Sequence, residues 1–270
     1  MLNRIAAGLI VAATTLLPSS LSFAADAAAL AVLGFSPDGR HFGFMQYGPR
    51  WDALEFHAEV FVVDTGRDRF VQGVPLRVSA EMKDDANEDN IGPQLKAFLA
   101  TVRKRTASLV RTHKISKPGA RLASAAEARA GEHSSGSDMP EAGAGVAAVT
   151  ARHPVLGDLT LRLDIKPMEW PKTSRYNSHK DATSCAEEMA PAKGAAFRLT
   201  LERRGQSILL HDDKTIPASR HCASGYGIVE VHAFDRPDGK VTLAVILGMR
   251  SRGFEGADRT FLAVTRVLER

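Results

Sequence analysis

The hydrophobic positions along this chain mostly follow the two-residue alternation, or the short apolar runs, that predict β-strands. The clearest case is an apolar run at residues 31–35, a Ser-Pro-Asp-Gly turn at 36–39, and a second apolar run at 41–45. Proline presets the backbone of a tight turn and glycine accepts the positive φ that closes it, so this pattern predicts a β-hairpin. Residues 59–64 and 69–71 extend the hairpin into an antiparallel meander.

The second half of the chain returns to the strand pattern. Apolar runs or alternation occur at residues 145–152, 159–165, 196–203, 207–211, 228–234, 241–249 and 260–267. A Pro-Asp-Gly turn at 237–239 joins two of these segments into a further hairpin. The polar stretch 176–191, which lies between the segments at 159–165 and 196–203, predicts a long loop.

A helix is predicted between the two strand-rich regions, beginning near Pro93. Its apolar residues fall largely on one face, and they are Leu95, Phe98, Leu99, Val102, Leu109 and Val110. The other face carries Lys96, Arg103, Lys104, Arg105 and Arg111. A basic amphipathic helix of this kind either packs its apolar stripe on a sheet or lies on an anionic membrane, and we expect the first.

Two neighbouring segments complete the local interpretation. The acidic residues 84–90 lack the glycine and glutamate that an EF-hand requires, so they predict a solvated loop rather than a calcium site. The Ala-rich residues 121–131 predict a second short helix.

These elements predict a β-rich α+β protein with sandwich-like antiparallel sheets and one or two helices in the middle. The expected division is an N-terminal meander with helices at 25–131, a flexible loop at 132–145, and a C-terminal antiparallel region at 146–270. The sequence pattern is compatible with either one body or two for the two β regions. Residues 35–40, the aromatic strand that follows them and residues 62–64 also resemble a single blade of a TolB or WD-type β-propeller. A full propeller needs at least four blades and is not expected.

The N-terminus has the three parts of a secretory signal peptide. Arg4 supplies the positive region, residues 5–17 form an uncharged apolar stretch, and Ser22 and Ala24 occupy the −3 and −1 positions. The pattern predicts cleavage after Ala24 and a periplasmic or secreted protein of a bacterium. A membrane anchor needs roughly 20 apolar residues, so we expect no transmembrane segment after signal removal.

The chain contains two cysteines, Cys185 and Cys222. An even number in an oxidising compartment favours one disulfide. The alternative is a reactive Cys222 activated by His221. Adjacent residues of a strand point to opposite faces, so they make a poor nucleophile–base pair, and we expect the disulfide.

The charge balance changes the expected partners only slightly. Without Arg4, the 35 basic residues fall to 34 against 31 acidic ones. Because the basic residues are spread along the chain, no concentrated phosphate-binding face is predicted and nucleic acid is not an expected partner. The expected partner is an unknown protein or an anionic envelope ligand.

No established catalytic or cofactor motif is present, so we predict no catalytic residue, metal or cofactor. Residues 211–213 (His-Asp-Asp) are interpreted as a polar turn rather than a metal site. Two polar clusters are candidate ligand-binding sites. The first comprises Ser219, Arg220, His221, Ser224 and Tyr226, and the second comprises Arg250, Arg252, Glu255, Asp258 and Arg259. Arginine forks in such turns recognise carboxylate or phosphate, although a surface ion-pair network is the alternative.

Several fragments spread over the chain carry a family resemblance. They are residues 34–40 followed by Phe42, residues 60–64, residues 216–220 leading into Cys222 and Gly225-Tyr226, and residues 253–256 followed by Asp258 and Arg259. Together they resemble domain-of-unknown-function family 2259, which comprises predicted secreted bacterial proteins. The resemblance implies secretion and no assigned activity.

The function expected from these observations is a non-enzymatic binding or envelope accessory protein. The alternative is a periplasmic hydrolase that uses an Arg/Asp/Glu cluster. That alternative requires Glu255, Asp258 and His221 to converge in one pocket.

Overall fold

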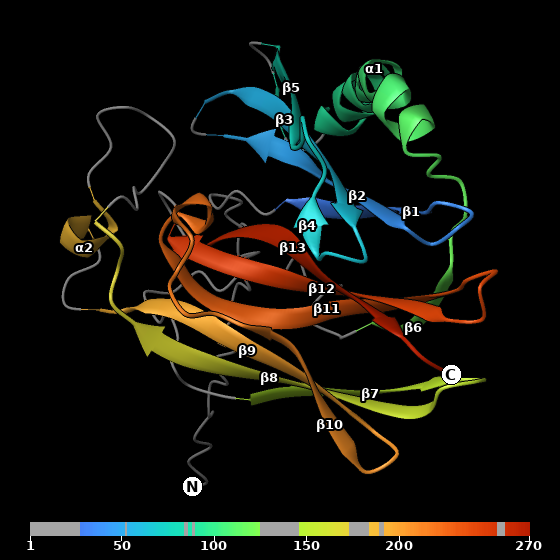
Figure 1. Ribbon diagram of the computed structural model, residues 1–270. Helices are drawn as coiled ribbons and strands as arrows, with labels where there is room; N and C mark the ends of the chain where they lie inside the picture. The colour runs from blue at the N-terminus through green and yellow to red at the C-terminus, as the bar shows by residue number, and fades with distance from the viewer. Residues whose placement is uncertain are drawn as a thin grey trace, which may run out of the picture.

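The computed structural model describes residues 28–51, 53–83, 86–87, 90–124, 146–172, 184–188, 192–252 and 257–270. Three antiparallel sheets are stacked on one another, and helix α1 (Ile91–Thr112) covers the outer face of the first (Figure 1). This architecture confirms the predicted β-rich α+β class. The predicted signal peptide and the predicted loop at 132–145 lie outside the described residues.

We name the sheets by their place in the stack. The helix-side sheet contains β1 (Ala29–Phe35), β2 (His41–Arg50), β3 (Glu55–Asp64), β4 (Arg69–Phe70) and β5 (Leu76–Glu81). The middle sheet has the order β13 (Ala257–Leu268), β12 (Val241–Arg252), β11 (Ala223–Asp235) and β6 (Ala120–Ser124). The far sheet has the order β10 (Gln206–Asp212), β9 (Gly194–Arg203), β8 (Gly157–Met168) and β7 (Val146–His153).

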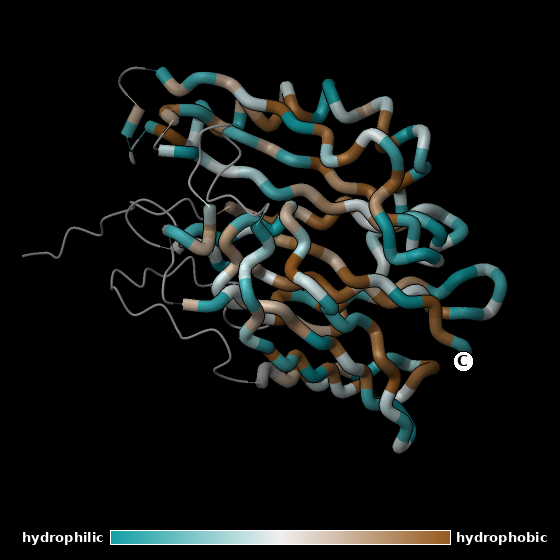
Figure 2. Tube along the Cα trace, turned by 60° about the vertical axis from the view of Figure 1, so that its left-hand side comes forward, coloured by the Kyte–Doolittle hydropathy of each residue, from teal (hydrophilic) through white to brown (hydrophobic). Residues whose placement is uncertain are grey.

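Strand β12 shows that the middle sheet is buried on both faces. Val245 and Leu247 belong to the core between the middle and far sheets, whereas Ala244 and Ile246 belong to the core on the helix side. Apolar residues therefore occupy successive positions without alternation, as expected for a strand covered on both faces. In Figure 2 the hydrophobic segments run along the strands, and the turns are largely hydrophilic.

Helix α1 packs its apolar stripe on the helix-side sheet. Phe98, Val102 and Thr106 are buried, and the Phe98 ring lies 5.6 Å from the ring of Phe56 on β3. The expectation that this stripe packs on a sheet is confirmed. Because the sheet covers it, the apolar stripe is not available to a membrane.

The predicted second helix at residues 121–131 is wrong where the structure describes it. Residues 120–124 form β6, which pairs with β11 through Glu230, Val231, His232 and Ala233. Alanine favours a helix by only a few tenths of a kcal/mol per residue, and pairing with the exposed edge of β11 outweighs that preference. Strand β5 was not predicted, because its sequence offers one buried position, Val78.

Three polar contacts join the middle sheet to the helix-side sheet. The Thr242 hydroxyl donates to the Gly39 carbonyl at 3.0 Å, and the Phe261 amide donates to the Gln46 side chain at 2.7 Å. The Asp68 carboxylate accepts from the Thr265 amide at 2.6 Å and from its hydroxyl at 2.9 Å. These contacts lie in or beside the apolar core between the two sheets.

Gly194 provides a first test of the packing around β9. A Cβ atom there would lie 2.4 Å from Cδ1 of Ile216 and 2.6 Å from the Trp170 ring. We expect Gly194→Ala to lower the free energy of unfolding by about 1–3 kcal/mol, because the core must shift to admit a methyl group. Urea denaturation measures this change.

Gly225 on β11 is the matched control for that variant. A Cβ atom at Gly225 meets nothing within 4 Å, so Gly225→Ala should change stability by less than about 0.5 kcal/mol. Equal stabilities for the two variants would contradict the packing described around Gly194.

Candidate functional site

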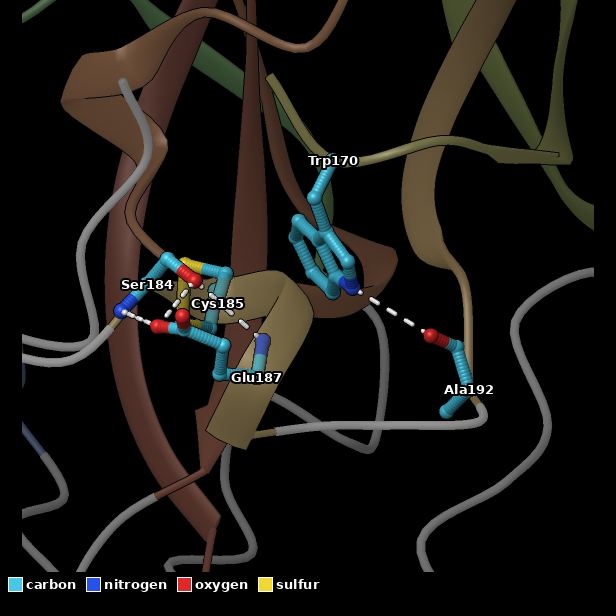
Figure 3. Close-up of a disulfide and its surroundings, with 6 residues drawn as sticks. Trp170, Ser184, Cys185, Glu187 and Ala192 are labelled. Atoms are coloured by element: carbon cyan, nitrogen blue, oxygen red, sulfur yellow. Dashed lines mark hydrogen bonds between the residues drawn. A yellow bond between two sulfur atoms is a disulfide. The ribbon is translucent and has the colours of Figure 1, made fainter. Parts of the chain in front are cut away.

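The predicted disulfide is present and closes one end of the middle sheet. Cys185 of helix α2 (Cys185–Glu188) is bonded to Cys222, which immediately precedes β11, with Cα atoms 5.3 Å apart. Both cysteines are buried beside Trp170, whose indole N–H donates to the Ala192 carbonyl at 3.3 Å (Figure 3). Since Cys222 is bonded, it has no thiol, and the reactive-cysteine alternative is wrong.

Arg220 is the centre of the first candidate cluster. It ends a 3-10 helix (Ala218–Arg220), two residues before Cys222. Its Nη1 donates to Asp213 Oδ2 at 2.6 Å and lies 3.4 Å from the Tyr226 hydroxyl. The guanidinium also lies 4.7 Å above the centre of the Phe197 ring. A cation on an aromatic face, paired with a carboxylate, is a stable arrangement for a buried arginine.

Asp213 connects this arginine to the far sheet. Its Oδ2 accepts from the Phe197 amide at 3.0 Å, and its Oδ1 lies 2.8 Å from His211 Nε2. The His211 ring stacks on Phe197 with centroids 4.7 Å apart. The side chain of Asp213 is 3% exposed and that of Arg220 is 13% exposed, so the ion pair is almost fully buried.

The electrostatics of the cluster follow from this burial and pairing. Burial alone would raise the pKa of Asp213, but His211 and Arg220 hold that pKa below its ordinary value. Burial alone would lower the pKa of Arg220, but Tyr226 and Asp213 raise it. Burial raises the pKa of Tyr226, with Arg220 opposing the effect. Asp213 therefore stays ionised and bound to its partners, which suits a structural ion pair better than a proton-transfer group.

The second candidate cluster contains two arginines at the ends of β12 and β13. Arg250 and Arg259 occupy directly opposite positions on these strands, so their side chains share one face of the middle sheet. Arg259 Nη2 lies 3.4 Å from the Ala28 carbonyl, and its guanidinium lies 5.6 Å from the centre of the Phe261 ring. Phe261 belongs to the helix-side core, so this face is the one towards the helix-side sheet.

Arg250 lies close enough to Arg259 to affect the ionisation of Arg259. Burial lowers the pKa of Arg259, and the positive charge of Arg250 lowers it further. Arg250 is exposed to solvent, whereas Arg259 is half-buried. The pair therefore combines one anchored guanidinium with one that a ligand can reach.

The structure separates the two clusters. Tyr226 packs against Phe197 of the far sheet, whereas Arg259 faces the helix-side sheet. Both lie at the same end of the middle sheet, because Tyr226 and Met249 are paired one position before Arg250. The middle sheet itself therefore stands between them.

Other candidate residues are His221, Arg252, Glu255 and Asp258. His221 is half-buried with φ of 47°, and its backbone amide donates to the Ala218 carbonyl. Arg252 and Asp258 are backbone partners of Ala257 and Ser251 in the β12–β13 pair. Glu255 lies outside the described residues, so the convergence that the hydrolase hypothesis requires is not tested.

One open depression lies beside the 3-10 helix and has a volume of about 460 Å³. It is lined by Met168, Glu169, Pro171 and residues 214–218. Neither His221 nor Asp258 lines it. Within the described residues, no group of three or more His, Cys, Asp or Glu side chains is placed to hold a metal ion.

Sequence reasoning missed Phe197, His211 and Asp213 as partners of Arg220. The only available signal was the His-Asp-Asp run, which predicted a polar turn. Among the described residues, no helix has the length and apolar character needed to cross a membrane.

Comparison with known proteins places the chain in a family without assigning an activity. No curated protein matches the sequence. The model of the family described as "Predicted secreted protein (DUF2259)" matches residues 43–266, which include all strands from β3 to β12 and most of β2 and β13. The chain therefore belongs to this family of predicted secreted proteins of unknown function.

Proposed function

We propose that this protein is a non-enzymatic binding protein of the bacterial periplasm, and that it binds an anionic ligand through Arg250 and Arg259. The observation that carries the proposal is the direct opposition of these two arginines on β12 and β13. The two opposed guanidinium groups concentrate positive charge on one face of the sheet. This charge favours binding of an oxyanion between them.

The chemistry of the pair favours a carboxylate or phosphate group. Guanidinium groups recognise both by parallel N–H···O hydrogen bonds. Arg259 is held in place by the Ala28 carbonyl and the Phe261 ring, so it loses little freedom when a ligand binds. Arg250 is exposed and completes the site from the solvent side.

Three features support the periplasmic location. The family consists of predicted secreted proteins, the N-terminal sequence has the pattern of a signal peptide, and the buried Cys185–Cys222 disulfide suits an oxidising compartment.

Thermal unfolding with added anions tests the proposed site. We expect sodium phosphate or citrate, at constant ionic strength, to raise the Tm of the wild-type protein. At a hundredfold excess over Kd the gain is about 2.7 kcal/mol, or roughly 5–10 °C for a protein of this size. Arg250→Gln should abolish the rise.

Arg204→Gln is the matched control, because Arg204 is an exposed arginine in the β9–β10 turn, on the far sheet. This control should respond to the anions like the wild type. An equal rise in Arg250→Gln and wild type would exclude the arginine pair as the site. A rise with chloride alone would indicate general screening.

The hydrolase hypothesis stays a prediction, because it depends on Glu255. No contact in the described part of the chain favours it over binding.

A further inference from the structure

Helix α1 has an unusual charge distribution. Its 22 residues include five basic side chains and no acidic one. The basic residues are Lys96, Arg103, Lys104, Arg105 and Arg111, and all five are exposed. The helix forms the outermost layer of the stack on the side away from the far sheet (Figure 1).

Most of these charges point in one direction. At about 100° per residue, Lys96, Arg103, Lys104 and Arg111 fall within an arc of about 100° on the helix surface. That arc lies opposite the buried residues Phe98, Val102 and Thr106. Exposed Lys114 and Lys117 continue the row beyond the end of the helix. We call the arc of four residues the basic face of α1.

Among the described residues, the basic face has no acidic partner of the kind found elsewhere on the protein. Elsewhere basic side chains commonly form ion pairs, such as Arg77 with Glu59 at 2.6 Å and Arg162 with Glu202 at 2.8 Å. None of the five basic residues of α1 forms an ion pair with another residue that the structure describes. The acidic residues that precede the helix, Asp84, Asp85, Glu88 and Asp89, lie outside the described residues.

We propose that the basic face of α1 docks the protein on the surface of a bilayer that contains anionic phospholipids. The helix is about 33 Å long, and the four cations of its basic face lie on one side along it, so a flat array of phosphate groups can contact these four at once. The apolar stripe is buried against the helix-side sheet, so the attachment is electrostatic and does not require insertion. Each basic side chain near such a surface strengthens binding by about fivefold.

The composition of this face favours lipid over a protein partner. Protein interfaces have an apolar centre with aromatic or aliphatic anchors. The large hydrophobic side chains that are exposed in the described chain are Leu54, Phe70, Val155 and Leu209, and none of them is on α1. A face of cations without such anchors fits a layer of anionic headgroups.

Vesicle co-sedimentation tests the proposal. The full chain should bind vesicles of phosphatidylethanolamine and phosphatidylglycerol at low salt, and should not bind vesicles of phosphatidylcholine alone. Replacing Lys96, Arg103, Lys104 and Arg111 together with glutamine should lower the partition coefficient by about 100-fold or more. Raising the salt to 0.5 M should release the wild-type protein, because the contacts are exposed.

The matched control removes the same number of charges from exposed positions on the far sheet and its connections, by Gln substitution of Arg152, Arg162, Lys193 and Arg204. It should retain most of the binding. Circular dichroism melting of both variants shows whether each still folds, and small Tm changes are expected because every substituted side chain is exposed.

Two results would overturn the proposal. Equal loss of binding in the two quadruple variants would mean that net charge alone is responsible. Tighter binding to heparin or duplex DNA than to the vesicles, lost in the same α1 variant, would identify a soluble polyanion instead. Arg250→Gln should leave vesicle binding unchanged, so this test stands apart from the anion site at Arg250 and Arg259.

Discussion

Replacing Asp213 with alanine is expected to lower the free energy of unfolding by about 3–5 kcal/mol, because it leaves the buried Arg220 without its carboxylate. Asp213 also accepts the Phe197 amide, and His211 bonds to its other oxygen. The variant therefore leaves a buried charge and a buried amide unpaired at once. Urea unfolding at pH 7 measures the loss.

Asp212 is the control beside it in the sequence. It accepts hydrogen bonds from Arg198, Lys166 and Lys214, and these cations hold its pKa below the ordinary value. The cations reach solvent, so they can be hydrated when the carboxylate is removed. Asp212→Ala should cost much less than Asp213→Ala, and equal losses would contradict the assignment of Asp213 as a buried ion-pair partner.

The same residue predicts a pH dependence. The pKa of Asp213 in the folded protein lies below its ordinary value of 3.8. The unfolded state therefore binds the proton more readily, so the stabilisation is complete above about pH 4 and is lost as the pH falls through the folded pKa. The difference between wild type and Asp213→Asn should accordingly be large at pH 7 and should shrink at pH 3, as measured by urea unfolding at both values. A difference that stayed constant would contradict the depressed pKa.

Removing the disulfide is the second change with a large expected effect. Cys185 and Cys222 are separated by 37 positions, and a crosslink over a loop of this length stabilises by about 3–4 kcal/mol. The double variant Cys185→Ala/Cys222→Ala should unfold roughly 10 °C lower than the wild type. Differential scanning calorimetry measures the shift.

Reduction separates the effect of the bond from that of the two substitutions. A reducing agent strong enough to open a buried disulfide should lower the Tm of the wild type and should leave the double variant unchanged. If the double variant had the wild-type Tm, the link between α2 and β11 would contribute nothing to thermal stability.

The elements predicted correctly are those encoded by local chemistry. The turn at residues 36–39 forms as expected: Gly39 has φ of 68°, and its amide donates to the Ser36 carbonyl at 2.8 Å. The apolar run at 241–249 correctly predicts β12. It does not say that β12 lies in the middle of the stack, because an apolar run is the same whichever sheets cover it. The strand β6 was missed because its partner is β11, more than 100 positions away in the sequence.

The candidate sites were predicted only in part. Arg220 and Tyr226 were singled out together, and the structure confirms that they are in contact. Asp213 was not recognised, since nothing local distinguishes a carboxylate buried against Phe197 and Arg220 from one in an exposed turn. The opposition of Arg250 and Arg259 depends on the register of β12 and β13, which the sequence does not fix.

A sheet that is apolar on both faces has no hydrophobic pattern to set its register. If β12 slipped by one residue, each side chain would exchange one core for the other, and most of the exchanged residues would still be buried among apolar neighbours. The Thr242 hydroxyl would then lose the Gly39 carbonyl, and a slip of β13 would likewise separate Phe261 from Gln46 and Thr265 from Asp68, at about 1–3 kcal/mol for each buried polar group left unpaired. These few polar contacts therefore select one pairing of the strands from several that are almost equally apolar.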